Sequence, residues 1–211
     1  YVEALNNVDK TKSYDVTEAI KVLKSLKSKK FDETVEAVFK VNMDTKKTDQ
    51  NIRGSLVLPN GTGKTKRVLV ITKTKANESA EADYCGAEDM IEKIEKENWF
   101  DFDTMIATPD MMPLLGKLGR VLGPKGLMPN PKAGTVTMVK DAISNIKKGM
   151  VEYKNDSFGN VHTVIGKLSF SEDKLEENLK AVASELLRVK PTAIKGTYIT
   201  NVSLSSTMSP G

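Results

Sequence analysis

Apolar residues recur along the chain with two different spacings, and each spacing predicts a different kind of element. In residues 15–28 and 171–190 they fall three to four positions apart, which predicts two helices with one apolar face each. In residues 31–43 and 196–205 apolar and polar positions alternate, which predicts strands that bury one face and expose the other. Neither end of the chain can cover its apolar faces alone. We therefore expect the two ends to fold together as one α+β domain.

The stretch between these ends has a different pattern, in which short apolar strands alternate with helices. This alternation predicts a small parallel or doubly wound sheet. Strands are predicted at residues 67–72 and 104–107, and helices at residues 77–82, 88–97, 110–117 and 138–148. Outside this stretch, residues 53–58 are predicted as a further strand, and residues 150–154 and 161–170 as a hairpin.

Glycines mark both places where the pattern changes. The fold class predicted is α/β with two domains: a discontinuous α+β domain of residues 1–61 and 150–211, and an inserted α/β domain of residues 62–149. Gly61 and Gly149 stand at the two crossings. Because a glycine backbone is unusually free, we expect the two crossings to act as a hinge.

The composition is that of a folded, soluble protein, with 39% hydrophobic and 28% charged residues and a net charge of +4. No apolar run approaches the roughly 18 residues that a membrane-spanning helix needs, so no membrane contact is expected. The single cysteine, Cys85, excludes an internal disulfide and fits a reducing compartment. We therefore expect a cytoplasmic protein.

Residues suited to catalysis are few. One cysteine and one histidine, His162, exclude a zinc site built from four such ligands, and we expect a structural or ligand-surface role for His162. Residues 61–65 invite comparison with a phosphate-binding loop, but Leu58 stands where the Walker pattern needs glycine, and a strand rather than a helix follows. An α/β enzyme that binds a phosphorylated ligand through the inserted domain is therefore only the alternative. No cofactor and no metal are expected.

Positive charge is concentrated in two stretches without an acidic residue. Residues 21–30 contain five lysines, which form either a solvated helix face or a contact for a polyanion. Residues 116–134, rich in glycine and proline, are predicted as a loop. This loop is either a rigid surface feature or a secondary basic loop that contacts a phosphate backbone. Its cations are Lys117, Arg120, Lys125 and Lys132.

Four segments together resemble a known family, the bacterial ribosomal protein L-one of the large-subunit stalk. They are residues 49–54, residues 58–64, the long motif of residues 122–132, and His162-Thr163-Val164-Ile165-Gly166-Lys167. The resemblance covers nearly the whole chain and implies a discontinuous domain with an inserted Rossmann-like domain. It also implies a structural constituent of the ribosome without enzyme activity.

The same resemblance implies the partners. They are the ribosomal RNA of the mobile stalk near the transfer-RNA exit site, exit-site tRNA, and the leader of the protein's own mRNA, whose translation it would repress. Away from the ribosome the resemblance implies a monomer. The family's Phe-Asp-Glu-Thr strand start matches residues 31–34, and its Thr-Met-Gly triad falls on Thr207, Met208 and Ser209, where serine replaces the family's glycine.

Short, rigid polar side chains on the strands of the discontinuous domain suit this function, because they lose little entropy when they bind RNA. Phe31 either stacks on a base or sugar or lies at the edge of the core. The expected RNA-binding residues are Lys30, Phe31, Thr34, Gly166, Lys167, Asn201, Ser203, Ser205, Thr207 and Met208.

Overall fold

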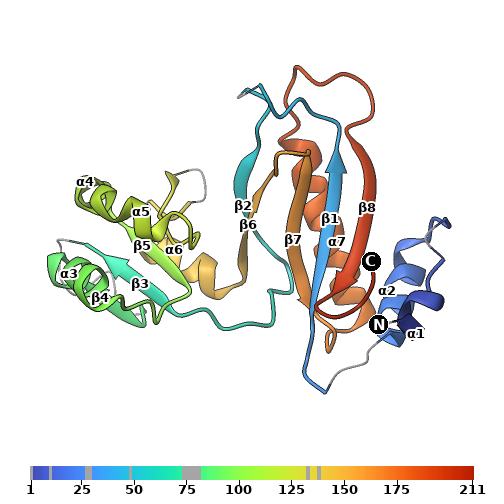
Figure 1. The fold of residues 1–211 in the computed structure, drawn as a ribbon, viewed down its shortest axis with the longest axis horizontal. Helices are drawn as coiled ribbons and strands as arrows, with labels where there is room; N and C mark the ends of the chain where they lie inside the picture. The colour runs from blue at the N-terminus through green and yellow to red at the C-terminus, as the bar shows by residue number, and fades with distance from the viewer. Residues whose placement is uncertain are drawn as a thin grey trace. The chain divides into compact units, whose positions relative to one another are not determined.

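The computed structural model describes residues 2–9, 11–26, 30–47, 49–72, 82–131, 134–136 and 139–211. The chain forms two compact units, Tyr1–Gly63 with Gly149–Gly211, and Lys64–Lys148. These limits lie beside the domain boundaries expected at Gly61 and Gly149. The chain is mixed α/β, as the sequence predicts (Figure 1). Among the described residues, no helix is long and apolar enough to cross a membrane.

A three-stranded antiparallel sheet organises the first unit. β1 (Thr34–Val41) lies in its centre, between β7 (Asn160–Lys167) and β8 (Ile199–Ser206). Its alternation is confirmed, because Val35, Ala37 and Phe39 are each at most 1% exposed. Helices α2 (Val16–Ser25) and α7 (Glu172–Arg188) pack on this apolar face, and Figure 1 shows α7 behind the sheet. The opposite face of the sheet, which we call the open face, carries the polar positions of the strands.

Two details of this unit differ from the sequence prediction. Val202 lies on the apolar face, opposite Phe39, as expected, but it is 42% exposed rather than buried, because β8 is the edge strand of its sheet and its neighbours cover it on one side only. A short helix, α1 (Val2–Asn6), was not predicted.

The predicted hairpin of residues 150–154 and 161–170 is wrong. β6 (Met150–Lys154) pairs with β2 (Arg53–Val57) in a separate two-stranded sheet, and β7 pairs with β1. Only a single bridge, Asn155 with Val161, joins the two expected partners. The Asn155 side chain explains the pairing, since its Oδ1 accepts from the amide of Ile52 at 2.9 Å and so holds the end of β6 beside β2.

The second unit is built on a parallel sheet with the order β4-β3-β5. All four residues of the central strand are buried, as expected for a strand covered on both faces. The elements are β3 (Val68–Ile71), β4 (Tyr84–Gly86), α3 (Glu88–Glu97), β5 (Thr104–Ala107) and α6 (Val139–Lys147). β4 was not predicted. The predicted helix at residues 77–82 falls, except for Ala82, outside the described residues.

The glycine-rich stretch that was predicted as a loop from residue 116 begins with helical turns. Met111, Leu115, Leu118 and Leu122 are all buried, and their spacing of three to four positions is that of a helix. Burial of this stripe outweighs the low helix propensity of the glycines between them. The turns are η1 (Pro109–Met111), α4 (Met112–Leu115), η2 (Gly116–Leu118) and α5 (Gly119–Leu122).

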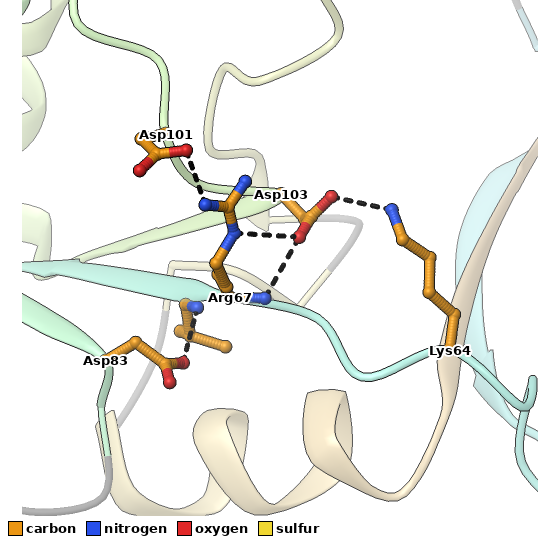
Figure 2. A network of polar contacts seen from close by, with 6 residues as sticks. Lys64, Arg67, Asp83, Asp101 and Asp103 are labelled. Atoms are coloured by element: carbon orange, nitrogen blue, oxygen red, sulfur yellow. Dashed lines mark hydrogen bonds and ion pairs between the residues drawn. The ribbon is translucent and has the colours of Figure 1, made fainter.

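Polar contacts fix the start of β3 in the second unit (Figure 2). One Asp103 oxygen accepts from the ammonium of Lys64 at 2.7 Å, and the other accepts from the backbone amide of Arg67 at 3.1 Å. The Arg67 guanidinium pairs with Asp101, and Asp83 accepts from the amide of Val68 at 2.9 Å. The hydrogen bond from Lys64 is the main reason why the pKa of Asp103 is lowered. The lysine that invited the phosphate-loop comparison is therefore held by a carboxylate.

Asn178 of α7 fastens the point where the chain leaves the first unit. Its side chain is fully buried; Oδ1 accepts from the amide of Asn60 at 3.0 Å, and Nδ2 donates to the carbonyls of Gly61 at 3.0 Å and Ile165 at 2.8 Å. A helix of the C-terminal part thus holds a turn of the N-terminal part. Sequence analysis gave Asn178 no role, since it stands among apolar residues at helical spacing.

We expect Asn178→Leu to lower the free energy of unfolding by about 3 kcal/mol, because it leaves an amide and two carbonyls without their partner. Urea unfolding followed by circular dichroism measures this. Ser184→Leu on the exposed side of the same helix is the control and is expected to change stability by less than about 0.5 kcal/mol. Equal effects of the two substitutions would contradict the role of Asn178.

Candidate nucleic-acid interface

The polar positions of three strands lie in register across the open face. Glu36 stands opposite Ser205 and Val164, and Lys40 stands opposite Asn201 and Asn160. Between these rows, Val38 stands opposite Ser203 and His162. Helices α2 and α7 contribute no residue to the open face, because both pack against the opposite, apolar face of the sheet. Asn201 and Ser203 are exposed and Ser205 is half-buried, so the register brings these three predicted residues onto one surface.

Thr34 is the centre of a polar group where β1 begins and β7 and β8 end. The ammonium of Lys167 donates to Thr34 Oγ1 at 2.8 Å. The amide of Thr207 donates to the Thr34 carbonyl at 3.1 Å, and the Thr207 hydroxyl accepts from the Thr34 amide at 3.1 Å. We call Thr34, Lys167 and Thr207 the Thr34 cluster. The structure therefore places together three predicted residues that are far apart in the sequence.

Two aromatic or flexible apolar side chains flank the Thr34 cluster. Phe31 is 50% exposed and Met208 is 48% exposed. A phenylalanine at the edge of the core would be largely covered, so the exposure of Phe31 favours the interpretation that it contacts a partner. Lys30, directly before it, is also exposed.

Two acidic residues that the sequence analysis left without a role hold this end of the sheet together. Glu33 is 1% exposed, and its Oε2 accepts from the Ser206 hydroxyl at 2.6 Å and from the Met208 amide at 2.9 Å. Asp32 accepts from the amide and the hydroxyl of Ser169, at 3.0 and 2.7 Å. The indication in the sequence was the Phe-Asp-Glu-Thr motif itself, which puts two acids in front of a strand expected to meet a polyanion.

The serine at the third position of the Thr-Met-Gly triad closes a turn. Ser209 Oγ accepts from the amide of Ser206 at 2.8 Å and donates to the carbonyl of Pro210 at 3.0 Å. Among the described residues other than glycine, only Asn98 has a positive φ, so Ser209 needs no glycine-like conformation. The replacement of glycine is therefore compatible with this backbone.

Gly166 lies below the surface rather than on it. Its φ is +152°, and a Cβ atom would come within 2.9 Å of the side chains of Leu175 and Phe170. Glycine is thus required by the packing of β7 on α7. The structure does not bring Gly166 onto the open face. Gly166 acts there indirectly, because its close packing fixes the backbone of the neighbouring Lys167.

Of the predicted basic residues in the second unit, Lys117 and Arg120 lie on the helical turns and Lys125 lies in the turn that follows α5. Lys117 and Arg120 are exposed, and the Lys125 ammonium lies 4.3 Å from the centre of the Phe100 ring. Lys132 falls outside the described residues. Gly116 and Gly119 beside these cations have ordinary helical φ values of −54° and −56°, and a Cβ atom at either would meet nothing within 4 Å.

Positive φ angles and a close backbone approach explain why glycine stands at both crossings. Gly61 and Gly149 have φ values of +67° and +102°. A Cβ atom on Gly149 would lie 2.5 Å from the Cα atom of Gly61, so the two chain crossings touch through backbone alone. Their action as a hinge stays a prediction.

The described residues offer little for metal binding or for catalysis by His162. They include no group of three or more His, Cys, Asp or Glu side chains that could hold a metal ion. His162 is exposed, and its Nε2 lies 3.7 Å from an Asp156 oxygen on the open face. This position agrees with a ligand-surface role.

The family model and three similar known proteins all belong to one family. The family model described as Ribosomal protein L1p/L10e family matches residues 23–210. Large ribosomal subunit protein uL1 of Mycoplasma capricolum subsp. capricolum is 56% identical over 214 residues, which cover 100% of this chain and 95% of that protein. The proteins of the same name from Mesoplasma florum and Phytoplasma australiense are also 56% identical, over 97% and 100% of this chain and 91% and 93% of their own lengths.

The Glu33 carboxylate allows a matched test of what orders the Thr34 cluster. Both of its hydrogen bonds go to the same oxygen, so Glu33→Gln keeps an acceptor there and is expected to cost less than about 1 kcal/mol of stability. Glu33→Leu leaves the Ser206 hydroxyl and the Met208 amide buried and unpaired, and is expected to cost about 2–4 kcal/mol. Chemical denaturation measures both, and hydrogen exchange of the Met208 amide is expected to quicken in Glu33→Leu alone. Equal losses in both variants would assign the effect to charge instead.

Proposed function

This chain belongs to the ribosomal protein L1p/L10e family, and we propose from that membership that its open face binds the ribosomal RNA of the large-subunit stalk near the tRNA exit site. Its relatives are named as large ribosomal subunit proteins, which makes the chain a structural constituent of that subunit and not an enzyme. The ribosome works in the bacterial cytoplasm, which is where the protein is proposed to act.

The Thr34 cluster is the observation that carries this proposal. Three side chains that can contact phosphates and 2′-hydroxyls are already held by one another and by the backbone. They are flanked by the exposed side chains of Phe31 and Met208, which offer contact to a base or sugar. Because the polar groups are fixed before RNA arrives, binding loses little conformational entropy. Structured RNA is recognised through such contacts to its shape and its 2′-hydroxyls.

The remaining partners follow from the same surface and from the second unit. An mRNA leader that folds like the stalk RNA meets the open face with the same contacts, so it competes with ribosomal RNA and its translation is repressed. Exit-site tRNA is proposed to meet the secondary basic surface of Lys117, Arg120 and Lys125. Away from the ribosome the protein is proposed to be a monomer.

Binding to a transcribed stalk RNA fragment is expected to weaken as salt rises. Lys30, Lys40 and Lys167 lie on or beside the open face, so log Kd is expected to change with log salt with a slope of roughly 2 to 3. Ser203→Glu, which puts a carboxylate in the middle of this face, is expected to weaken binding about tenfold or more. Fluorescence anisotropy at several salt concentrations measures both effects.

The matched control is Ser184→Glu on α7, which changes the net charge equally but lies away from the open face. It is expected to weaken binding by less than about twofold. Equal losses from the two substitutions would show that only the net charge matters, and absence of binding at low salt would refute the proposal.

Alanine substitutions at the glycines of the secondary basic surface are expected to raise stability and to weaken tRNA binding. Alanine fits at Gly116 and Gly119 and favours their helical conformation, so the double substitution is expected to stabilise the second unit by about 1 kcal/mol. If tRNA approaches the backbone at Gly116 and Gly119, the added methyl groups hold it away. Ribosomes that carry the double variant are then expected to bind exit-site tRNA several-fold more weakly, which filter binding of deacylated tRNA measures. Asn145→Ala on α6 is the control, since it raises helix propensity alone. Unchanged tRNA affinity in the double variant would remove this surface from the proposal.

A further inference from the structure

The most exposed large hydrophobic side chain among the described residues is Phe158, which is 76% exposed. It belongs to the turn between β6 and β7, and Asn160 after it pairs with Lys40, six positions from Thr34 in β1. Figure 1 shows this turn between β6 and β7 at the end of the sheet opposite to the start of β1. Sequence analysis gave it no role. A single exposed hydrophobic residue needs no explanation by itself, but Phe158 is held in an ordered turn with polar surroundings.

Four hydrogen bonds hold the backbone of the turn around Phe158. Asp156 Oδ1 accepts from the amides of Phe158 and Asn160, at 2.8 and 2.7 Å. The Lys40 ammonium donates to the Phe158 carbonyl at 2.6 Å, and the Thr45 hydroxyl donates to the Ser157 carbonyl at 2.8 Å. The hydrogen bonds from Asn160 and Phe158 help to lower the pKa of Asp156 to about 2, so this turn keeps its carboxylate at neutral pH. The ring is therefore presented by an ordered turn and not by a loose loop.

The turn is continuous with the open face. Lys40, which binds the Phe158 carbonyl, stands in the register row of Asn160 and Asn201. His162, which lies 3.7 Å from Asp156, stands in the next row with Ser203. Lys40 stands six positions after Thr34 in β1, which corresponds to about 20 Å along the strand. The open face thus has an exposed phenylalanine at each end, Phe31 at one and Phe158 at the other.

The surroundings of the ring favour RNA over a protein partner. A protein interface needs a contiguous apolar core, whereas the nearest residues that fix this turn are Lys40, Thr45, Asp156 and Asn160, all polar or charged. Lys46, Lys47 and Lys154 are exposed on the segments joined to or paired with the turn. The Asp156 carboxylate is occupied by the amides of the turn, and Lys47 lies 4.0 Å from Asp44, so of these three lysines Lys46 and Lys154 are the cations left to meet a phosphate backbone while the isolated ring stacks on a base.

We propose that the Phe158 ring stacks on an unpaired base of the RNA that lies along the open face, and so forms a second anchor beyond the far end of β1, whose span from Thr34 to Lys40 is about 20 Å. This inference rests on the proposed function. It adds a contact at the far end of the face and a requirement on the RNA, which must offer an unstacked base beyond that span.

The test compares Phe158→Ala and Phe158→Trp with the wild type in binding to the transcribed stalk RNA fragment. Loss of one base-stacking contact is expected to weaken binding roughly five- to hundredfold in Phe158→Ala. Phe158→Trp is expected to bind at least as tightly as the wild type. Because the residue is uncharged, the salt dependence of both variants is expected to equal that of the wild type.

A second measurement does not depend on the affinity. The wild type has one tryptophan, Trp99, in the second unit. The additional indole of Phe158→Trp is expected to lose fluorescence when RNA is added, while the wild-type emission changes little. Leu187→Ala on α7 is the matched control, since Leu187 is 56% exposed on a helix that packs on the other face of the sheet. Thermal melting of each free variant shows whether the fold is kept.

The outcomes separate this inference from the proposed function. If Ser203→Glu weakens binding but Phe158→Ala binds like the wild type, the second anchor is refuted and the open face remains the binding surface. If the Phe158→Ala loss equals that of Leu187→Ala, or the added indole is not quenched, the anchor is also refuted. If the wild type does not bind the fragment at low salt, the proposed function fails and the anchor with it.

Discussion

The buried carboxylate of Glu33 is the interaction on which the open face depends. It stands directly before β1 and holds the Ser206 hydroxyl and the Met208 amide, so it joins the beginning of the sheet to the end of the chain. A carboxylate that is 1% exposed is tolerated only when hydrogen bonds replace its lost hydration. That requirement fixes the turn at residues 207–209, and with it the position of the Thr207 hydroxyl. The geometry of the Thr34 cluster is therefore set by a side chain that is itself buried.

A second constraint comes from the discontinuity of the first unit. Two distant parts of the chain share one core, so every crossing between the units must leave the first unit's hydrogen bonds intact. Asn178 meets this need by binding Asn60, Gly61 and Ile165 at once, and the backbones of Gly61 and Gly149 approach more closely than any side chain would permit. The Asn178 side chain thus supplies partners for three backbone groups of the first unit at this point. This explains how an 85-residue unit, Lys64–Lys148, can interrupt the chain without dividing the core.

The sequence predicts well those features that depend on local periodicity and poorly those that depend on pairing between distant segments. The alternation through Val35, Ala37 and Phe39 locates β1 and its buried face, and Gly61 and Gly149 stand beside the limits of the two compact units. The hairpin prediction fails because residue spacing does not show which strand β6 will meet, and Asn155 decides that through a contact 103 residues away. The sequence does not reveal the helical turns beside Gly116 and Gly119, because the low helix propensity of glycine favours a loop there. The burial of four apolar residues at helical spacing overcomes that propensity in the fold. At the candidate site, the surface residues follow from alternation and resemblance, whereas Glu33 and Asp32 act through tertiary contacts that one strand's pattern cannot reveal.

The internal hydrogen bonds of the Thr34 cluster constrain the RNA that the open face is proposed to bind. Thr207 and Lys167 already bind Thr34, so their remaining capacity for hydrogen bonds points in directions set by the protein. A partner must match those directions, because rearranging the cluster would leave backbone groups of β1 unpaired. Under the proposed function, recognition depends on RNA shape more than on base identity, so that one surface can serve both of the proposed partners, a ribosomal RNA and a similarly folded leader. On the same reasoning, an anchor at Phe158 selects between such RNAs by length, since only one with an unstacked base beyond the span of about 20 Å from Thr34 to Lys40 engages both ends. The rigidity that lowers the entropic cost of binding is therefore also what limits the set of RNAs that fit.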